Sequence, residues 1–163
     1  MSNLILKVKM MDKYLTKIGG DIAGEWCDLR ASNIKSINGS KLDDKDYLSD
    51  IGALYYNKGD VLLIGLGFGT NLPEGYEAII NPRSGTFKNY GFLLTNSQGV
   101  IDQSYIGEWM AMVYCTRDGK IEYNDRFLQF RIQKQQPLAT FEFVDELDET
   151  ERGSGAYSST GIK

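Results

Sequence analysis

Three polar segments of this sequence combine residue types that can bind phosphate, accept a proton or stack on a ring. The first is residues 82–85, where an arginine, a serine and a glycine follow a predicted short strand at residues 77–80. A forked guanidinium, a hydroxyl and an accessible backbone amide together suit a phosphate group. The same Pro-x-Ser-Gly pattern also forms ordinary turns, so these residues alone leave a phosphate-binding loop and a turn as alternatives.

The second segment is residues 96–108, which begin with a turn bracketed by Asn96 and Gly99. Asp102 and Tyr105 follow, three residues apart. A carboxylate that is ionised at pH 7 can accept a proton from water, although an aspartate is a weak base. In a purely structural interpretation Asp102 caps a turn and Tyr105 belongs to the core, and the segment alone does not exclude this.

The third segment is the C-terminal stretch 152–161. It joins the guanidinium of Arg152, several hydroxyls, many glycine amides and the ring of Tyr157. A flexible clamp for an anion, with a ring that stacks on a base, needs these groups. Because a Gly/Ser-rich tail cannot bury enough apolar surface to order itself, the alternative is a solvated tail that binds nothing.

The composition excludes several other chemistries. The 163 residues include no histidine, and 18 basic against 22 acidic residues give a formal charge of −4. Without histidine there is neither a Ser-His-Asp triad nor a histidine-ligated metal. The two cysteines, Cys27 and Cys115, are too far apart in the sequence to form a Cys-x-x-Cys pair. The negative charge argues against non-specific binding of nucleic acid.

Targeting and nucleotide-binding patterns are also missing. The longest apolar run, residues 61–68, is far shorter than the ~20 residues of a membrane-spanning helix. Because the N-terminus lacks the apolar stretch of a signal peptide, we expect a cytoplasmic protein with no membrane partner. Gly65, Gly67 and Gly69 lack the spacing of a dinucleotide-binding loop, and residues 161–163 lack the rest of a Walker A loop. The three glycines predict a bent strand or close backbone packing instead.

The elements that position these segments are predicted to be strands. Apolar and polar residues alternate over residues 4–10, 127–133 and 138–143, which is the period of a half-buried strand. The richer apolar run 109–114 predicts a strand buried on both faces, and the Asp-Gly pair at 118–119 predicts a tight hairpin turn after it. Together with 18 glycines, this pattern predicts an all-β sandwich or barrel.

One segment has a helical period instead. The apolar residues of 47–55 recur at helical spacing, acidic residues at 43–46 suit a helix N-terminus, and residues 57–60 would end the helix. The C-terminal part differs again, with an acidic run at 145–151 before the Gly/Ser-rich stretch. We therefore expect one short helix within 47–55, and a linker and arm outside the main domain.

In their order along the chain, these segments and two others resemble the five motifs of the homotrimeric dUTPases, the deoxyuridine triphosphate nucleotidohydrolases. The counterparts are residues 27–31, 82–85, 99–108, 125–129 and 152–161. The third, Gly-Val-Ile-Asp-x-x-Tyr-x-Gly-Glu, is near-complete and specific, and the overall character is that of short bacterial and bacteriophage members. The departures are Glu25 and Trp26 for Ala and Gly, Asn124 for Gly, Tyr157 for Phe, and Ala156 and Ser158 for Gly.

The resemblance implies a distorted jelly-roll β-barrel formed by residues 1–144, with the short helix in an insertion at about residues 41–57. It implies an acidic linker and flexible arm at residues 145–163, and a homotrimer whose active sites are shared between subunits. The implied reaction converts dUTP and water to dUMP and pyrophosphate, which keeps uracil out of DNA and supplies dUMP. Mg²⁺ would assist while bound mainly through the substrate triphosphate.

The resemblance also implies a role for each motif residue. Asp102 would be the catalytic base, Asp28 would reach Mg²⁺ through water or serve in a turn or ion pair instead, and Arg126 would be structural. Contacts to uracil and deoxyribose would come from Asn96, Gly99, Val100, Ile101, Tyr105 and Tyr157. Contacts to the phosphates would come from Arg83, Ser84, Gly85, Gln129, Arg152, Ser159, Thr160 and Gly161.

Two rival functions remain on the sequence alone. A dCTP deaminase would need a glutamate near the base, but Glu108 lies in a Tyr-x-Gly-Glu setting that matches the dUTPases, and deaminases lack the C-terminal arm. A regulatory protein with a dUTPase-like scaffold would bind a repressor, and the insertion at about residues 41–57 is the natural surface for that partner. The simpler expectation is that the insertion packs on its own barrel.

Overall fold

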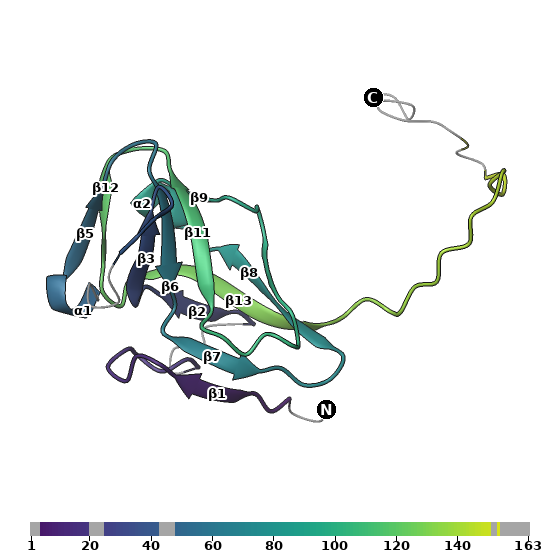
Figure 1. The fold of residues 1–163 in the computed structure, drawn as a ribbon, viewed down its shortest axis with the longest axis horizontal. Helices are drawn as coiled ribbons and strands as arrows, with labels where there is room; N and C mark the ends of the chain where they lie inside the picture. Colours follow the sequence, from purple (N-terminus) through teal and green to yellow (C-terminus); the bar gives the residue numbers. More distant parts are fainter. Residues whose placement is uncertain (1–3, 20–24, 43–47, 151–152, 154–163) are drawn as a thin grey trace.

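The computed structural model describes residues 4–19, 25–42, 48–150 and 153, and short strands dominate them (Figure 1). The strands are β1 (Lys7–Met10), β2 (Cys27–Arg30), β3 (Asn33–Ile37), β4 (Ser40–Lys41), β5 (Ala53–Tyr56), β6 (Val61–Gly65), β7 (Phe68–Asn71), β8 (Tyr76–Pro82), β9 (Phe92–Leu94), β10 (Gly99–Ile101), β11 (Met110–Cys115), β12 (Gly119–Glu122) and β13 (Arg126–Lys134). The helices are α1 (Leu48–Ile51) and α2 (Thr86–Tyr90). Neither helix of these ranges has the length and hydropathy that crossing a bilayer requires. The all-β prediction is confirmed.

Two antiparallel sheets form the body of the molecule. One has the strand order β10-β8-β13-β2 and the other β4-β3-β6-β11-β9. Two-stranded sheets, β1-β7 and β12-β5, complete the described part. Both large sheets contribute side chains to one buried cluster, so the body has a single hydrophobic core.

The core is rich in aromatic rings. Phe68 packs on Trp109 with ring centroids 4.8 Å apart, and Trp109 meets Phe130 edge to face at 5.1 Å. These three side chains are almost fully buried, and burying each one contributes roughly 1.5–3 kcal/mol. The core therefore fixes the strands that carry the candidate site, because Phe130 lies on β13 and Trp109 directly precedes β11.

The bend between β6 and β7 brings backbones close together. Gly67 has φ +71°, and a Cβ there would lie 2.9 Å from the Ser32 side chain. At Gly65 a Cβ would lie 2.4 Å from Asn33 Oδ1. A Cβ on Gly69 would lie 2.7 Å from the Gly107 carbonyl oxygen, so the bend and the close backbone packing that the sequence offered as alternatives are both present.

Two predictions around β11 are wrong. Met110, Met112 and Tyr114 point outward and are 38%, 43% and 40% exposed, so the strand is buried on one face only. Nor do β11 and β12 form a hairpin, because β11 pairs with β6 and β9 whereas β12 pairs with β5. The Asp118 carboxylate accepts a hydrogen bond from the Lys58 amide at 2.7 Å, which ties the loop after β11 to the turn before β6.

The predicted helix is shorter than its sequence pattern implied. α1 ends at Ile51, because Gly52 takes a left-handed conformation with φ +75°. Leu54 and Tyr55, expected on the same helix, belong to β5. The expected N-terminal part, residues 43–47, lies outside the described residues.

The described part of the insertion packs on the body. This is the simpler of the two expectations for the insertion. Leu48 of α1 and Tyr56 of β5 both belong to the common core. The Tyr56 hydroxyl donates a hydrogen bond to the Tyr90 carbonyl at 2.7 Å. Tyr90 ends α2, a helix that the sequence pattern did not predict, and Gly91 stops that helix with φ +70°.

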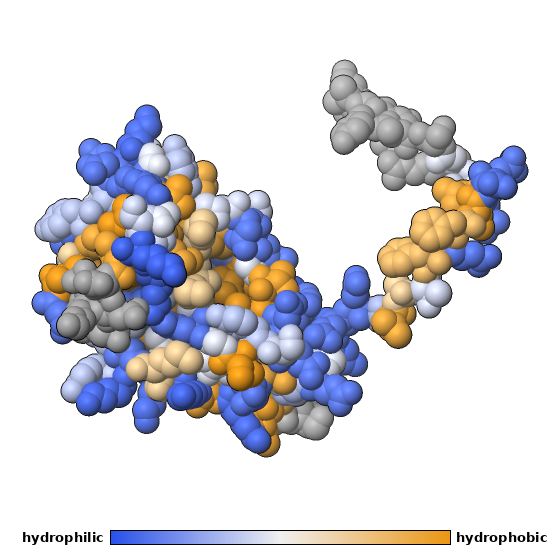
Figure 2. Space-filling view, in the orientation of Figure 1, coloured by the Kyte–Doolittle hydropathy of each residue, from blue (hydrophilic) through white to orange (hydrophobic). Residues whose placement is uncertain are grey.

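The segment after β13 leaves the body of the molecule (Figure 1). Residues 138–143 were predicted to be a strand, and that prediction is wrong for this chain: they pair with no strand among the described residues. Phe141 and Phe143 are 82% and 97% exposed, and Figure 2 shows the apolar surface that this segment presents. An alternating pattern makes a strand only where a partner and a core exist, and the chain's own body supplies neither.

Candidate active site

The third motif lies on β10 and the turn after it. β10 pairs with β8, with Gly99 opposite Ile80 and Ile101 opposite Ala78. A Cβ on Gly99 would lie 3.1 Å from the Ile80 Cβ, so a glycine lets the two strands approach. β10 is the edge strand of its sheet, so one row of its backbone N–H and C=O groups has no strand partner in the described ranges.

The turn predicted between Asn96 and Gly99 does not join two paired strands. β9 pairs with β11 whereas β10 pairs with β8, so this loop carries the chain from one large sheet to the other. Gln98 Nε2 donates a hydrogen bond to Asn81 Oδ1 at 3.1 Å, which holds the loop against β8. Asn96 is exposed on the loop.

An open hollow of about 200 Å³ lies beside β10. Its lining, which we call the Asp102 hollow, consists of Val100, Ile101, Asp102, Tyr105 and Met110. Asp102 is exposed and Tyr105 is 37% exposed, so Tyr105 is not a core residue. The Tyr105 amide donates to the Asp102 carbonyl at 3.0 Å, which places both side chains on one turn.

A second set of motif residues meets where β2, β8 and β13 lie side by side. The Asp28 carboxylate is 2.7 Å from Arg83 Nε and 3.2 Å from Arg126 Nη1. Arg83 also donates to the Arg126 carbonyl at 3.1 Å. The structure thus shows the ion pair that the sequence left open for Asp28. Together with Gln129, these three residues form what we call the Asp28 cluster.

Strand register explains how the Asp28 cluster forms. Gln129 lies between two partners, opposite Asp28 on β2 and opposite Asn81 on β8. Its Nε2 donates a hydrogen bond to the Pro82 carbonyl at 3.1 Å. Since Arg83 follows Pro82 directly, three separate motifs meet at one end of this sheet.

The loop after β8 is held by Thr86, a residue that sequence reasoning missed. Its hydroxyl accepts a hydrogen bond from the Arg83 amide at 2.8 Å and donates one to the Phe127 carbonyl at 2.6 Å. Thr86 is buried, whereas Ser84 is exposed at the tip of the loop and Gly85 is half-buried. A threonine three residues after the arginine is typical of a side-chain-to-backbone turn, and this signal could have identified it.

The two sets of residues lie at opposite ends of β8. Ile101 is opposite Ala78, and Arg83 is five positions further along, which is about 17 Å of extended strand. A single chain therefore does not bring the Asp102 hollow and the Asp28 cluster together. The expected arm residues Arg152, Tyr157, Ser159, Thr160 and Gly161 lie outside the described residues.

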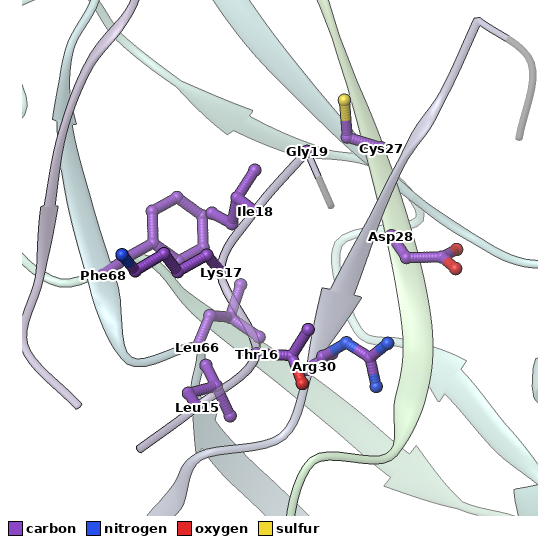
Figure 3. Close-up of a pocket in the computed structure, with 10 residues that line it drawn as sticks. All are labelled: Leu15, Thr16, Lys17, Ile18, Gly19, Cys27, Asp28, Arg30, Leu66 and Phe68. Carbon is purple, nitrogen blue, oxygen red and sulfur yellow. The ribbon is translucent and has the colours of Figure 1, made fainter. Parts of the chain in front are cut away.

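A small, partly open recess lies beside Asp28 (Figure 3). Its volume of about 10 Å³ suits one water molecule and no nucleotide. Figure 3 shows the Asp28 carboxylate pointing away from Phe68, which lines the same space. Cys27 is also part of the lining, and burial, followed by the negative charge of Asp28, raises the pKa of its thiol.

Carboxylates do not gather into a metal cage within the described ranges. These ranges contain no group of three or more His, Cys, Asp or Glu side chains that could hold a metal ion. Asp28 offers one carboxylate, which is already paired with two guanidinium groups. Mg²⁺ keeps several waters and commonly takes one or two carboxylates together with substrate phosphates. This donor set fits a cation that is held mainly by the substrate and reaches Asp28 through water.

Comparison with known proteins places the motifs in a family. The family model described as dUTPase matches residues 48–161, which is more than half of the chain. This chain belongs to the dUTPase family. The SPbeta prophage-derived deoxyuridine 5'-triphosphate nucleotidohydrolase of Bacillus subtilis (strain 168) is 39% identical, over 97% of this chain and 99% of that relative. The deoxyuridine 5'-triphosphate nucleotidohydrolase of Bdellovibrio bacteriovorus is 30% identical, over 99% of each chain.

Solved dUTPase structures share the fold. A mutant dUTPase of Staphylococcus bacteriophage 80alpha with dUpNHpp has a TM-score of 0.72 and 16% identity, over 97% of this chain and 99% of that chain. A mutant dUTPase of phage phi11 of S. aureus has a TM-score of 0.65 and 13% identity, over 87% of this chain and 97% of that chain. Its description refers to the coordination of a structural Mg(II) ion. The dUTPase-type barrel implied by the sequence motifs is therefore confirmed.

Proposed function

We propose that this dUTPase-family chain hydrolyses dUTP to dUMP and pyrophosphate. The observation that carries the proposal is the Asp102 hollow, where an exposed carboxylate, an aromatic ring and the edge strand β10 lie side by side. Two relatives that match this chain over nearly its full length are named for that reaction. A carboxylate can activate water, while a fixed backbone edge and a ring can select the base and the sugar.

The edge of β10 and the loop before it would recognise uracil. Residues 96–101 offer backbone donors and acceptors in fixed positions. Cytosine presents a donor where uracil presents an acceptor, and such a mismatch leaves buried polar groups unpaired. The ring of Tyr105 would lie against the deoxyribose and occupy the space that a 2′-hydroxyl requires.

Asp102 would act as general base toward the attacking water. The water oxygen forms a bond to the α-phosphorus, the bond from that phosphorus to the oxygen of the leaving pyrophosphate breaks, and the water proton passes to the carboxylate. Because a carboxylate is a weak base, alignment and charge neutralisation have to supply most of the rate. The hydrogen bond from the Tyr105 amide to the Asp102 carbonyl supports this role, since it fixes the turn that carries the carboxylate.

The Asp28 cluster and the loop beside it would take the phosphates. Arg83 offers a guanidinium, Ser84 a hydroxyl and Gly85 an amide, with Gln129 on the adjoining strand. Asp28 keeps Arg83 in place through the 2.7 Å ion pair and would contact the water shell of Mg²⁺. When bound, Mg²⁺ supplies charge neutralisation at the phosphate oxygens.

The C-terminal arm would complete the site. Tyr157 would stack on uracil, and further phosphate contacts would come from Arg152, Ser159, Thr160 and Gly161. The described segment after β13, which extends away from the body, supports this proposal (Figure 1). An arm that leaves its own subunit is free to reach a site on another one.

The complete site would lie between subunits of a homotrimer. Residues some 17 Å apart along β8 cannot both contact one α-phosphate, but the Asp102 hollow of one subunit can face the Asp28 cluster of the next. The outward face of β11 and the exposed apolar side chains after β13 offer the surface that such an assembly buries.

A substrate panel tests the proposed function. Pyrophosphate release with Mg²⁺ is measured from dUTP, UTP, dCTP and dTTP, and ammonia is followed in parallel. We expect fast release from dUTP alone, because the backbone edge rejects cytosine and Tyr105 rejects the ribose. Ammonia from dCTP would instead indicate a deaminase, and binding of dUTP with no release from any nucleotide would indicate a regulatory protein.

A further inference from the structure

The carboxylate of Glu108, which the proposed mechanism does not use, is held by three partners. Its Oε1 accepts hydrogen bonds from Asn33 Nδ2 at 3.2 Å and from the Gly67 amide at 3.0 Å. Its Oε2 lies 2.7 Å from Lys35 Nζ. The Glu108 side chain is only 15% exposed, so these contacts are shielded from water and fix it more firmly than a surface ion pair does.

The partners of the Glu108 carboxylate lie in a closely packed part of the fold. Asn33 is 6% exposed on β3, and Gly67 forms the bend between β6 and β7. A Cβ on Gly65 would lie 2.5 Å from Glu108 Oε1, so the carboxylate fills the space that this glycine leaves. Glu108 is thus anchored both to β3, through Asn33 and Lys35, and to the bend after β6, through Gly67.

The backbone of Glu108 in turn holds Tyr105. The Tyr105 hydroxyl donates a hydrogen bond to the Glu108 carbonyl at 2.7 Å. A Cβ on Gly107 would lie 2.7 Å from this hydroxyl, so the glycine leaves room for the phenol to reach across the turn. The next amide, that of Trp109, donates to the Phe68 carbonyl at 2.9 Å, which fixes the backbone on the far side of Glu108. Direct contacts therefore connect Lys35, through Glu108, to a ring that lines the Asp102 hollow.

We propose that Glu108 is a positioning residue that sets the place of the Tyr105 ring and thereby the selection of deoxyribose over ribose. The proposal rests on the proposed function, in which Tyr105 lies against the sugar. A displacement of about 1 Å changes how a site fits its substrate, and here it would admit a 2′-hydroxyl while the uracil contacts of β10 remain. Glu108 itself touches no substrate.

The ratio of kcat/KM for dUTP to kcat/KM for UTP measures this selection. Lys35→Met removes the ion pair and leaves both hydrogen bonds to Glu108, and Lys35 is exposed enough for the replacement to fold. We expect the ratio to fall on the order of tenfold, through faster turnover of UTP, with kcat for dUTP within about twofold of the wild type. Lys35→Arg keeps the cation and should restore the ratio. Lys41→Met, at an exposed position of β4, is the matched control and should leave the ratio unchanged.

A double-mutant cycle separates positioning from stability. Tyr105→Phe keeps the aromatic ring and removes the hydroxyl that contacts the Glu108 carbonyl. We expect Tyr105→Phe to lower the dUTP/UTP ratio as well. Adding Lys35→Met to Tyr105→Phe should lower the ratio little further, because both substitutions act through the contact between Tyr105 and Glu108. Thermal unfolding midpoints of the same variants report stability separately. Multiplicative effects of the two substitutions would overturn the inference.

The outcomes distinguish this inference from the proposed function beneath it. A wild-type protein that does not prefer dUTP over UTP would overturn the proposed function and the inference together. A wild-type protein with a strong preference, which the folded Lys35→Met variant retains in full, would overturn the inference and leave the proposed function intact.

Discussion

Asp28 affects its neighbours in opposite ways. Its carboxylate stabilises the guanidinium groups of Arg83 and Arg126, which lie 2.7 Å and 3.2 Å away. The same negative charge disfavours a thiolate on Cys27, whose pKa is raised first by burial and then by Asp28. Cys27 therefore reports the charge state of the cluster that is proposed to bind phosphate.

We predict that Asp28→Asn accelerates the alkylation of Cys27 in the folded protein, by roughly severalfold. Loss of the negative charge lowers the pKa of the thiol, so a larger fraction is thiolate at pH 8 and the reaction is faster. The rate is measured with iodoacetamide, and peptide mapping assigns the label to Cys27.

Two controls accompany this measurement. Cys115 is buried, and burial followed by the charge of Asp60 raises its pKa to about 12, so it should stay unlabelled in every folded variant. Burial and the charge of Asp28 raise the pKa of Cys27, so we expect Glu25→Gln, which changes neither, to leave the rate unchanged. Equal acceleration by both substitutions would show that Asp28 does not control the thiol.

A second prediction at the residue scale concerns the proposed base. We expect Asp102→Asn to lower kcat for dUTP by about 10²–10⁴ while dUTP binding persists, because an amide of the same shape cannot take up the proton. Single-turnover kinetics and calorimetric binding of a non-hydrolysable analogue separate the two effects. Asp50→Asn, at an exposed position of α1, should keep full activity. Unchanged turnover in Asp102→Asn would remove this residue from the mechanism.

At the scale of the elements, the alternation of apolar and polar residues predicted a strand well where one face of that strand packs on the core. β13 lies where alternation placed it, because its buried side chains meet the aromatic core. Residues 138–143 carry the same alternation but meet no core of their own chain. The Asp-Gly turn at 118–119 likewise showed where the chain turns but not which strand it would join, since pairing of β12 with β5 is a long-range contact.

The same limit applies to the candidate site. The resemblance to the dUTPase motifs named Asp28, Arg83, Asp102 and Gln129. The distance between Asp102 and Arg83 could not be predicted, since it depends on the register of β10 on β8. The anchoring of Glu108 could not be predicted either, because the hydrogen-bond partners of Glu108 lie about 40 to 75 positions away in the sequence.

The C-terminal element provides the third prediction. We expect a chain that ends after Glu151 to fold normally but to lose nearly all dUTP turnover, roughly 100-fold or more, because the arm contributes phosphate contacts and not packing. Circular dichroism melting and a pyrophosphate assay measure the two properties. Removal of Lys163 alone should change neither. Full activity of the shorter chain would show that the arm takes no part in the reaction.

A site shared between subunits leads to a prediction for the whole molecule. Asp102→Asn impairs the Asp102 hollow and Arg83→Ala impairs the Asp28 cluster, so each variant should be nearly inactive alone. When the two are unfolded and refolded together, mixed trimers should regain about a quarter of wild-type turnover, since random assembly pairs an intact hollow with an intact cluster that often.

The matched control for this experiment is a mixture of Arg83→Ala with the double variant Arg83→Ala/Asp102→Asn. That mixture contains no intact Asp28 cluster, so it should stay as inactive as its components. If the first mixture gains no activity over its separate variants, each site lies within a single subunit.

The exposed segment after β13 also bears on the colloidal behaviour of the protein. Leu138, Phe141 and Phe143 are almost fully exposed on an extended chain, and such a segment tends to associate with copies of itself. Glu142 interrupts the aromatic residues and the acidic run at 145–151 follows them, so like charges keep these segments apart. The acidic residues after β13 would therefore limit aggregation of any copy whose apolar segment is not buried in the proposed trimer.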